Sequence, residues 1–434
     1  MKHYRQKMLG MPRGWLVVIC GALFYCYQFT LRVLPNVMHD ELVKDLMLDA
    51  SMFGTMIAFY SWSYATAQLP LGIILDHYGA GKLITLACLI CALSCFIFAS
   101  TTSFYVASFA QFLMGLGSAC GFLGSIKLGT IWFPPTHVAR VIAVILIFGT
   151  IGAVLGGTPL SALTDYIGWQ PTMHVLGGIG IFITVILYLV IGRHKDPVVY
   201  EPTANILSGL KTVLAKPQAW LISTYGMLMY VPITVMGVAW GVPYMLSVYD
   251  ISEQCAASII SCMFFGAAVG SPLFTYYSDK IKQRCRPMVI GALVGLIANF
   301  LIVCIPNIPL GIMYVLFFFA GFAYTAKSLS FASICEIMPK TSSGVAVGFI
   351  NTVTMANGAI FHPLIGKMLD YNAGNNGSLP QIDIYSQWDY RFALTIIPVS
   401  IFIAAVIVWF IRETHHEAPL TAAEKGAVLL SDVE

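Results

Sequence analysis

The chain has 434 residues, of which 58% are apolar and only 10% charged, and its formal net charge at pH 7 is +3. Soluble domains are about 25% charged, so this composition excludes soluble enzymes, disordered regulators and nucleic-acid binders. It indicates an integral membrane protein that crosses the lipid bilayer many times.

Twelve apolar runs are each long enough to cross a hydrocarbon layer of about 30 Å as a helix. We therefore expect an all-α membrane protein with twelve transmembrane helices. In chain order the runs cover residues 14–37, 51–75, 83–99, 104–131, 138–163, 171–192, 218–246, 254–278, 287–305, 308–335, 344–369 and 392–411.

The longest polar stretch lies halfway along the chain and separates six runs from six. An internal repeat supports this division, because Gly-Phe-x4-Lys over residues 121–127 recurs over residues 321–327, and Asp76 matches Asp279. Two halves of like orientation imply a pseudo-twofold axis along the membrane normal and a substrate site between them near the midplane. We predict a leader (1–13), an N-terminal six-helix bundle (14–192), a linker (193–217), a C-terminal six-helix bundle (218–411) and a tail (412–434).

Basic residues gather on one side of the predicted membrane. If the N-terminus is cytosolic, most of the 23 Lys and Arg residues lie in cytosolic segments, and the outer loops hold only Lys44 and Arg391. The positive-inside rule then places both termini in the cytosol. With its short loops, the sequence favours a multi-pass protein of a bacterial inner (plasma) membrane.

Catalytic and metal-binding motifs are absent from the sequence. It contains no GxSxG, P-loop or HExxH motif, and its 11 cysteines lie nearly all in apolar runs, where small packing residues are expected. We expect no enzymatic activity, no cofactor and no metal. Without an ATP site, uphill transport would require an ion gradient.

Cations inside the predicted spans carry the functional hypothesis. Arg32 lies in the first run, and Lys127 and Lys327 occupy equivalent repeat positions in the fourth and tenth runs. Charges are costly in hydrocarbon and usually face a bundle interior or an aqueous cavity. Acidic residues are scarce within the runs, so uncompensated cations favour a substrate with a carboxylate or another anion. The alternative is snorkelling of these side chains to the lipid headgroups.

Polar and aromatic residues supply further candidates for the substrate site, with simple packing as the alternative for each. These candidates are Tyr25, Gln28, Tyr64, Trp240 and Asn351. Two residues are candidates for carrying a coupling proton, namely His362, because its imidazole titrates near neutral pH, and Glu336 near the end of the tenth run.

A local motif joins the second and third runs, Gly72-x3-Asp76-x2-Gly79-x2-Lys82. Gly72 permits close helix approach, Gly79 permits a tight turn, and a carboxylate such as Asp76 is favoured at a neighbouring helix N-terminus. The motif resembles the signature loop of the major facilitator superfamily, which acts as a cytosolic latch. The resemblance implies a gating role for these four residues.

Two related motifs occur elsewhere in the chain. The second half keeps a degraded copy of the loop around Asp279, for which the resemblance also implies a gating role. The eleventh run ends in Gly366-x3-Asp370 on the other side of the membrane. The fifth run carries Gly149, Gly152 and two further glycines at three- and four-residue spacing, which predicts a groove for close helix packing or a hinge.

The resemblance spans about residues 14–412 and implies the major facilitator fold, with two pseudo-symmetric six-helix bundles. In that fold helices one, four, seven and ten line a central cavity, so Arg32, Lys127 and Lys327 would point toward one space. Segments 24–35, 68–72 and 127–135 are similar to a branch with the lysosomal dipeptide transporter family and amino-acid transporters of intracellular bacteria. That branch implies an amino acid or short peptide, although Gln28 stands where an acidic partner for a substrate amine is expected.

The sequence therefore predicts a secondary active transporter that moves a small carboxylate-bearing solute (amino acid, short peptide or organic anion) by alternating access. Its partners would be that solute, the lipid bilayer and a proton or sodium gradient, and we expect a monomer. One alternative is an efflux pump or a siderophore or drug carrier of the same fold. A more distant alternative is a non-transporting membrane receptor, which usually has a larger soluble domain.

Overall fold

The computed structural model describes residues 11–192, 206–339, 342–375 and 385–414, and all regular structure in these ranges is helical. This confirms the predicted all-α class. Most of the predicted leader, linker and tail lie outside the described residues. Where the two bundles begin and end therefore stays a prediction.

The helices coincide with the predicted apolar runs. The first half of the chain forms α2 (Met11–Val37), α3 (His39–Asp45), α4 (Ala50–Tyr78), α5 (Ala80–Ala99), α6 (Phe104–Trp132), α7 (Pro135–Leu155), α8 (Thr158–Ile167), α9 (Trp169–Leu187) and η1 (Tyr188–Gly192). The second half forms α10 (Ile206–Leu214), α11 (Pro217–Met229), η2 (Ile233–Trp240), α12 (Gly241–Val248), α13 (Glu253–Ile281), α14 (Cys285–Cys304), α15 (Leu310–Tyr324), η3 (Thr325–Lys327), α16 (Ser328–Ile337), α17 (Ser343–Asn375), α18 (Gln387–Leu394) and α19 (Ile396–Val408).

Eleven helices in the described part of the chain are long and apolar enough to cross a membrane. The helix of the second predicted run, α4, has 29 residues but is not among these eleven. Its middle carries the polar sequence Tyr60-Ser-Trp-Ser-Tyr64 and then Gln68. The composition of α4 therefore suits a place inside the bundle better than a place facing lipid.

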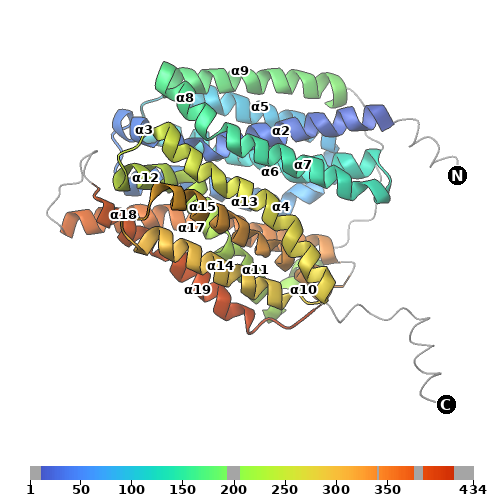
Figure 1. Ribbon diagram of the computed structural model, residues 1–434. Helices are drawn as coiled ribbons and strands as arrows, with labels where there is room; N and C mark the ends of the chain where they lie inside the picture. The colour runs from blue at the N-terminus through green and yellow to red at the C-terminus, as the bar shows by residue number, and fades with distance from the viewer. Residues whose placement is uncertain (1–10, 193–205, 340–341, 376–384, 415–434) are drawn as a thin grey trace, which may run out of the picture.

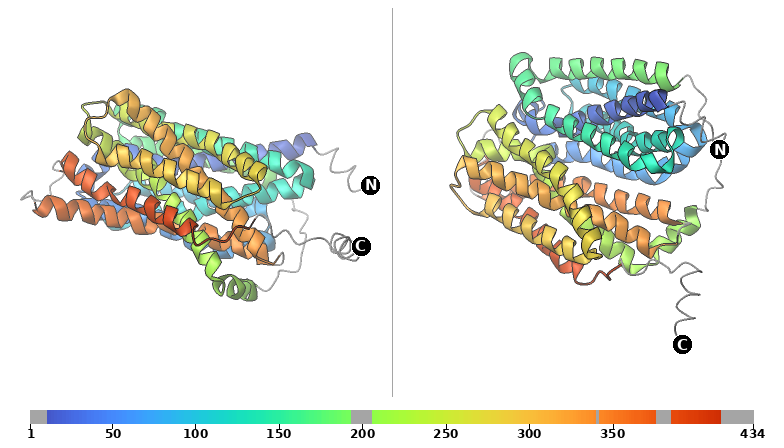
Figure 2. Two further views of the ribbon diagram at one scale, coloured as in Figure 1. Left: turned by 60° about the horizontal axis from the view of Figure 1, so that its bottom comes forward. Right: turned by 45° about the vertical axis from the view of Figure 1, so that its right-hand side comes forward.

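The helices of the two halves lie side by side along a common direction (Figures 1 and 2). The short helix α3 marks one end of the bundle, here named the α3 end, and α10 marks the opposite end, here named the α10 end. The halves meet where α4 packs on α17, α2 on η2, and α7 and α8 on α13. The two spans that contain α2 and α11–α12 are 78% and 83% buried, against 33% for α9 with η1, so they lie at the centre.

Five of the predicted spans are broken or change helix type, including the sixth, which ends in the π-helix η1, and the twelfth, which breaks at Thr395 between α18 and α19. The fifth breaks between α7 and α8 at Gly156, the seventh contains the π-helix η2, and the tenth contains the 3₁₀ turn η3. In the fifth span, a β-carbon on Gly149 or Gly152 would overlap Tyr25 or the backbone of Cys26 in α2. The predicted glycine groove therefore accommodates α2, and the break lies directly after it.

The turn between α4 and α5 has the predicted form. Gly79 has a φ of 86°, which places it in the left-handed region that favours glycine, and α5 begins at the next residue. Lys82 is exposed in the first turn of α5. The side chains at positions 72 and 76 lie outside the described part of the structure, so the gating role of this loop stays a prediction.

Candidate functional site

Two cations from opposite halves of the chain meet at one aromatic ring. The ammonium nitrogen of Lys327 lies 3.4 Å from the ring centroid of Tyr230, and the guanidinium carbon of Arg32 lies 5.4 Å from the same centroid. Both distances are typical of cation–π contacts. Arg32 and Lys327, which the sequence predicts to face one space, are therefore neighbours.

Aromatic side chains from α2, α4 and α15 complete the surroundings of these cations. Arg32 also lies 5.7 Å from the ring of Phe29 and 5.9 Å from that of Tyr64, and Lys327 lies 5.7 Å from that of Tyr324. We name Arg32, Phe29, Tyr64, Tyr230, Tyr324 and Lys327 the cationic cluster. Rings tolerate a nearby cation without neutralising it, so the positive charge stays available to an anion.

Neither cation of the cluster forms an ion pair with a carboxylate within 4.0 Å among the described residues. The polar contact of the Arg32 guanidinium is to a weak acceptor, the Sδ of Met355 in α17, at 3.6 Å. Both Arg32 and Lys327 are part-buried rather than fully enclosed. The arrangement can accept a carboxylate, because partly desolvated cations without a counter-charge bind an anion strongly.

Breaks in the helices bring the second half's residues to the cluster. α11 ends at Met229, so Tyr230 occupies its C-cap, and Pro232 then precedes the π-helix η2. Lys327 ends the 3₁₀ turn η3, whose Thr325 hydroxyl donates to the carbonyl of Phe322 at 2.6 Å. Ser and Thr hydroxyls that bond to a preceding carbonyl compete with regular helix geometry. Distorted helical turns of this kind recur at functional sites.

Gln28 and Asn351, also predicted for the substrate site, form hydrogen bonds close to the cationic cluster. The Tyr60 hydroxyl donates to Gln28 Oε1 at 3.2 Å, and Asn351 Nδ2 donates to Gln68 Oε1 at 2.7 Å. The second of these bonds joins α17 to α4 and therefore links the two halves. Tyr25, also predicted for the site, is buried against Phe29 and Phe122.

Trp240, predicted for the substrate site, and His362, predicted for proton coupling, both lie where the two halves pack on each other. Trp240 is fully buried and packs on Phe53 and His39, near the α3 end. His362 is also fully buried, and neither ring nitrogen has a hydrogen-bond partner among the described residues. Both therefore lie in packed contacts between the halves, and a role in transport for either stays a prediction.

Glu336 and Asp279 meet at the α10 end, away from the cationic cluster. The Arg284 guanidinium binds Glu336 at 2.8 Å and Asp279 at 2.7 Å. Glu336 lies nine residues after Lys327, or ~13 Å along a helix. Its predicted part in proton coupling and the gating role of Asp279 stay predictions, and the structure adds that both carboxylates share one cation.

Lys127 is part-buried in the unbroken helix α6. The contacts that join Arg32 to Lys327 do not include it. Six residues earlier, Gly121 packs against Gln28 and Tyr25, so Lys127 lies ~9 Å farther along the helix, toward the α10 end. Whether Lys127 belongs to the substrate site stays a prediction.

Several residues near the site have little or no signal in the sequence. Tyr324 precedes Lys327 by three residues, and this i, i+3 spacing is a usable signal. Met355 shows none, because a methionine in an apolar run normally indicates packing. Asn36 has no signal in the sequence either. Its buried amide accepts from the Val242 N–H and donates to the Met236 carbonyl, both at 2.8 Å.

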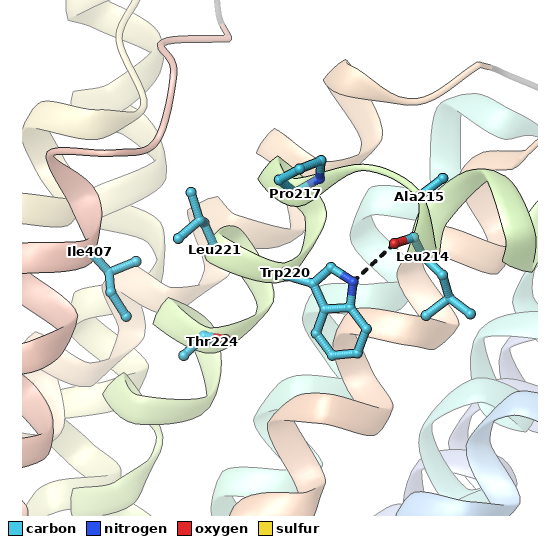
Figure 3. A pocket seen from close by; sticks show the side chains of 7 residues that line it. All are labelled: Leu214, Ala215, Pro217, Trp220, Leu221, Thr224 and Ile407. Carbon is cyan, nitrogen blue, oxygen red and sulfur yellow. Dashed lines mark hydrogen bonds between the residues drawn. The ribbon is translucent and has the colours of Figure 1, made fainter.

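A separate hollow lies outside the cluster, between α10, α11 and α19 (Figure 3). The Trp220 indole lines it and donates to the Leu214 carbonyl at 3.1 Å. No ionisable side chain lines it, so it does not share the chemistry of the cluster. Its lining residues are Leu214, Ala215, Pro217, Trp220, Leu221, Thr224 and Ile407.

Comparison with known proteins gives a consistent picture. Residues 18–361 match the family described as Major Facilitator Superfamily, and a second match covers residues 226–433. The chain is 23% identical to the "Probable galactarate/D-glucarate transporter GudP" of Escherichia coli, over 86% of this chain and 91% of that protein. It is 20% identical to the "Hexuronate transporter" of Bacillus subtilis, over 85% of this chain and 90% of that protein.

A solved structure resembles this fold over nearly its whole length. It is that of a bacterial homologue of the human lysosomal transporter Spinster, in an inward-facing and unoccupied conformation. The TM-score is 0.76 at 17% sequence identity, and the likeness covers 92% of this chain and 97% of that chain. At this identity the likeness concerns the fold alone.

Proposed function

Because the chain belongs to the Major Facilitator Superfamily, and is thus a membrane transporter rather than an enzyme, we propose that it carries a small hydroxylated organic anion with at least one carboxylate, such as a sugar acid. The observation that carries this proposal is the meeting of Arg32 and Lys327 at the ring of Tyr230. One cation comes from each half of the chain. An anion held by both would therefore bridge the halves.

The names of the full-length relatives support a sugar acid. The proteins from Escherichia coli and Bacillus subtilis are named as transporters of galactarate, D-glucarate and hexuronate. Such anions combine a carboxylate with several hydroxyl groups. Beside the cluster, Tyr64 and the amides of Gln68 and Asn351 offer donors and acceptors for hydroxyl groups.

The narrower expectation of a dipeptide or amino-acid transporter receives no support from these relatives. A zwitterion also needs a partner for its ammonium group. Gln28, at the position where that partner is expected, already accepts a hydrogen bond from Tyr60. Cations without a carboxylate neighbour in the described part of the chain favour an anion over a zwitterion.

In a transport cycle by alternating access, Arg32 and Lys327 would hold the anion between the two halves. The substrate would bind between the halves near the midplane, and the halves would then rock so that the site opens to the other side of the membrane. We propose that the α10 end faces the cytosol, since Lys82 lies in the first turn of α5, Lys280 in the last turn of α13, and Arg284 just after α13. We also propose a monomer in a bacterial inner membrane, driven by a proton or sodium gradient.

Uptake into proteoliposomes tests the substrate class. We expect saturable uptake of radiolabelled D-glucarate, galactarate or a hexuronate, and little uptake of dipeptides or neutral amino acids. Replacing Arg32 with Ala removes one charged partner of the carboxylate, so KM should rise at least about 30-fold. Preferential dipeptide uptake, or unchanged sugar-acid kinetics in Arg32→Ala, would contradict the proposal.

A further inference from the structure

The seam between α4 and α17 is tightest near the α3 end. These two helices run antiparallel, and glycines bring their backbones together. A β-carbon on Gly54 would overlap the His362 carbonyl, and one on Gly366 would overlap the Ala50 carbonyl. Small residues at such positions let two helices approach closely within a membrane.

The same helix pair is looser toward the α10 end. A β-carbon on Gly348 would meet only a Leu69 methyl group at 3.8 Å, and one on Gly344 would have no described atom within 4 Å. Gly344 and Gly366 lie on the same helix, so the difference reflects the distance between the halves. The seam is therefore closed at the α3 end and spread at the α10 end.

Asp370 of α17 caps the N-terminus of α4 from the other half of the chain. Its carboxylate accepts from the backbone N–H of Ser51 at 2.9 Å and of Ala50 at 3.3 Å, and from the Ser51 hydroxyl. The Tyr385 hydroxyl also donates to it. The first amides of a helix lack partners within the helix, and a carboxylate there is favoured by the helix dipole.

Within α4, only the next amide is capped locally, since Asp49 accepts from the Met52 N–H at 2.6 Å. Asp370 therefore binds the Ser51 amide and shares the Ala50 amide with the Tyr385 hydroxyl, which accepts from that N–H at 3.1 Å. If the halves separate at the α3 end, all of these bonds break together. The capping of the first α4 amides therefore depends on whether the α3 end is closed or open.

We propose that Gly366 and Asp370 form a latch that holds the α3 end of the two halves closed and must release α4 before the substrate site can open at that end. The spacing Gly-x3-Asp equals that of Gly72 and Asp76, near the opposite end of α4. Gly366 lets the two backbones approach, and Asp370 then binds the exposed amides. On the prediction that Gly72 and Asp76 form a cytosolic latch, α4 would carry the same kind of latch at both ends, one for each side of the membrane.

The distance between spin labels at the α3 end tests this latch without any substrate, so its failure is distinguishable from failure of the sugar-acid proposal. One label replaces the exposed Met47 in the first half and the other replaces the exposed Trp388 in the second. A second pair, at the exposed Tyr78 and Tyr276, reports on the α10 end. The part-buried cysteines are replaced by serine in this background.

In Asp370→Asn the carboxylate charge is lost, and we expect the ratio of open to closed α3-end populations to rise about tenfold. In Gly366→Leu the closed distance should disappear, and sugar-acid uptake should fall at least about 20-fold. The matched control is Gly374→Leu on the same helix, where a β-carbon would meet no described atom within 4 Å. It should leave both distances and uptake within about twofold of the wild type.

Unchanged α3-end distances in both Asp370→Asn and Gly366→Leu would overturn the proposal. If Gly366→Leu does not fold, as judged by its thermal melting in detergent, Asp370→Asn and Ser51→Ala decide the matter. Ser51→Ala removes only the hydroxyl bond to Asp370 and should shift the populations in the same direction by a smaller factor. A shift toward the closed state in either variant would also overturn it.

Discussion

The fourth and tenth spans share the sequence Gly-Phe-x4-Lys, yet they fold differently. The first copy lies in α6, a helix of 29 residues without a break. The second copy is interrupted by the 3₁₀ turn η3, which separates α15 from α16 and ends at Lys327. The equivalent lysines therefore lie in helical segments of different form, and Lys327 shares the ring of Tyr230 with Arg32.

The hydroxyl groups between the shared positions form different hydrogen bonds in the two copies. In α6, the Ser125 hydroxyl bonds to the carbonyl four residues earlier, at Gly121, which suits an α-helix. In the second copy, Thr325 bonds to the carbonyl three residues earlier, at Phe322, which suits a 3₁₀ turn. A sequence repeat thus indicates equivalent places in a fold, but not equivalent roles.

The largest effect should come from exchanging the two lysines for alanine one at a time. In Lys327→Ala the substrate carboxylate loses one of its two partners, and we expect KM for the sugar acid to rise at least about 100-fold. Lys127→Ala should change KM by less than about threefold. Uptake kinetics in proteoliposomes measure both, and equal losses would show that the two repeats act alike.

Substitutions of Tyr230 test whether its aromatic ring contributes to substrate binding. In Tyr230→Ala both cations lose the ring between them, and we expect KM to rise about 10- to 30-fold through lost cation–π contacts and looser positions of the charges. Tyr230→Phe keeps the ring and should stay within about twofold of the wild type. A loss in Tyr230→Phe as large as in Tyr230→Ala would instead point to the hydroxyl.

The smallest effect concerns the hydroxyls that differ between the repeats. In Thr325→Val the bond to Phe322 disappears while the shape of the side chain is kept, and we expect uptake to fall about three- to fivefold as the turn at Lys327 loosens. The matched change in α6, Ser125→Ala, should leave uptake within experimental error. Equal uptake in the two variants would show that the turn at Lys327 is not the cause of the difference between the two repeats.

The fold follows from the sequence almost completely, because helix length and apolarity decide it. Each of the twelve predicted runs contains a helix, and Gly79 makes the predicted turn. The resemblance predicts that Arg32, Lys127 and Lys327 face one space, because it places their helices around a central cavity, and the ring of Tyr230 joins two of the three, Arg32 and Lys327. Hydropathy could not show the breaks at η2 and η3, since a distorted helix is as apolar as a regular one.

Contacts between distant segments were the part that the sequence could not supply. Tyr230 lies in a different span from both cations, and no spacing rule connects them. In the sequence, Asp370 is visible only as part of a Gly-x3-Asp pattern. Its partners are backbone amides of α4, and because every residue but proline has such an amide, the sequence does not indicate which ones it binds. The partner of such a carboxylate becomes visible only when the helices are placed.

The polar composition of α4 also bears on how the protein enters its membrane. The tyrosines, serines and glutamine in the middle of α4, of which Gln68 bonds to Asn351 of the other half, make α4 a poor candidate for partitioning into lipid alone. We expect this helix to leave the insertion machinery together with a more apolar neighbour such as α5 or α6, so that biogenesis and transport place opposing demands on the same residues.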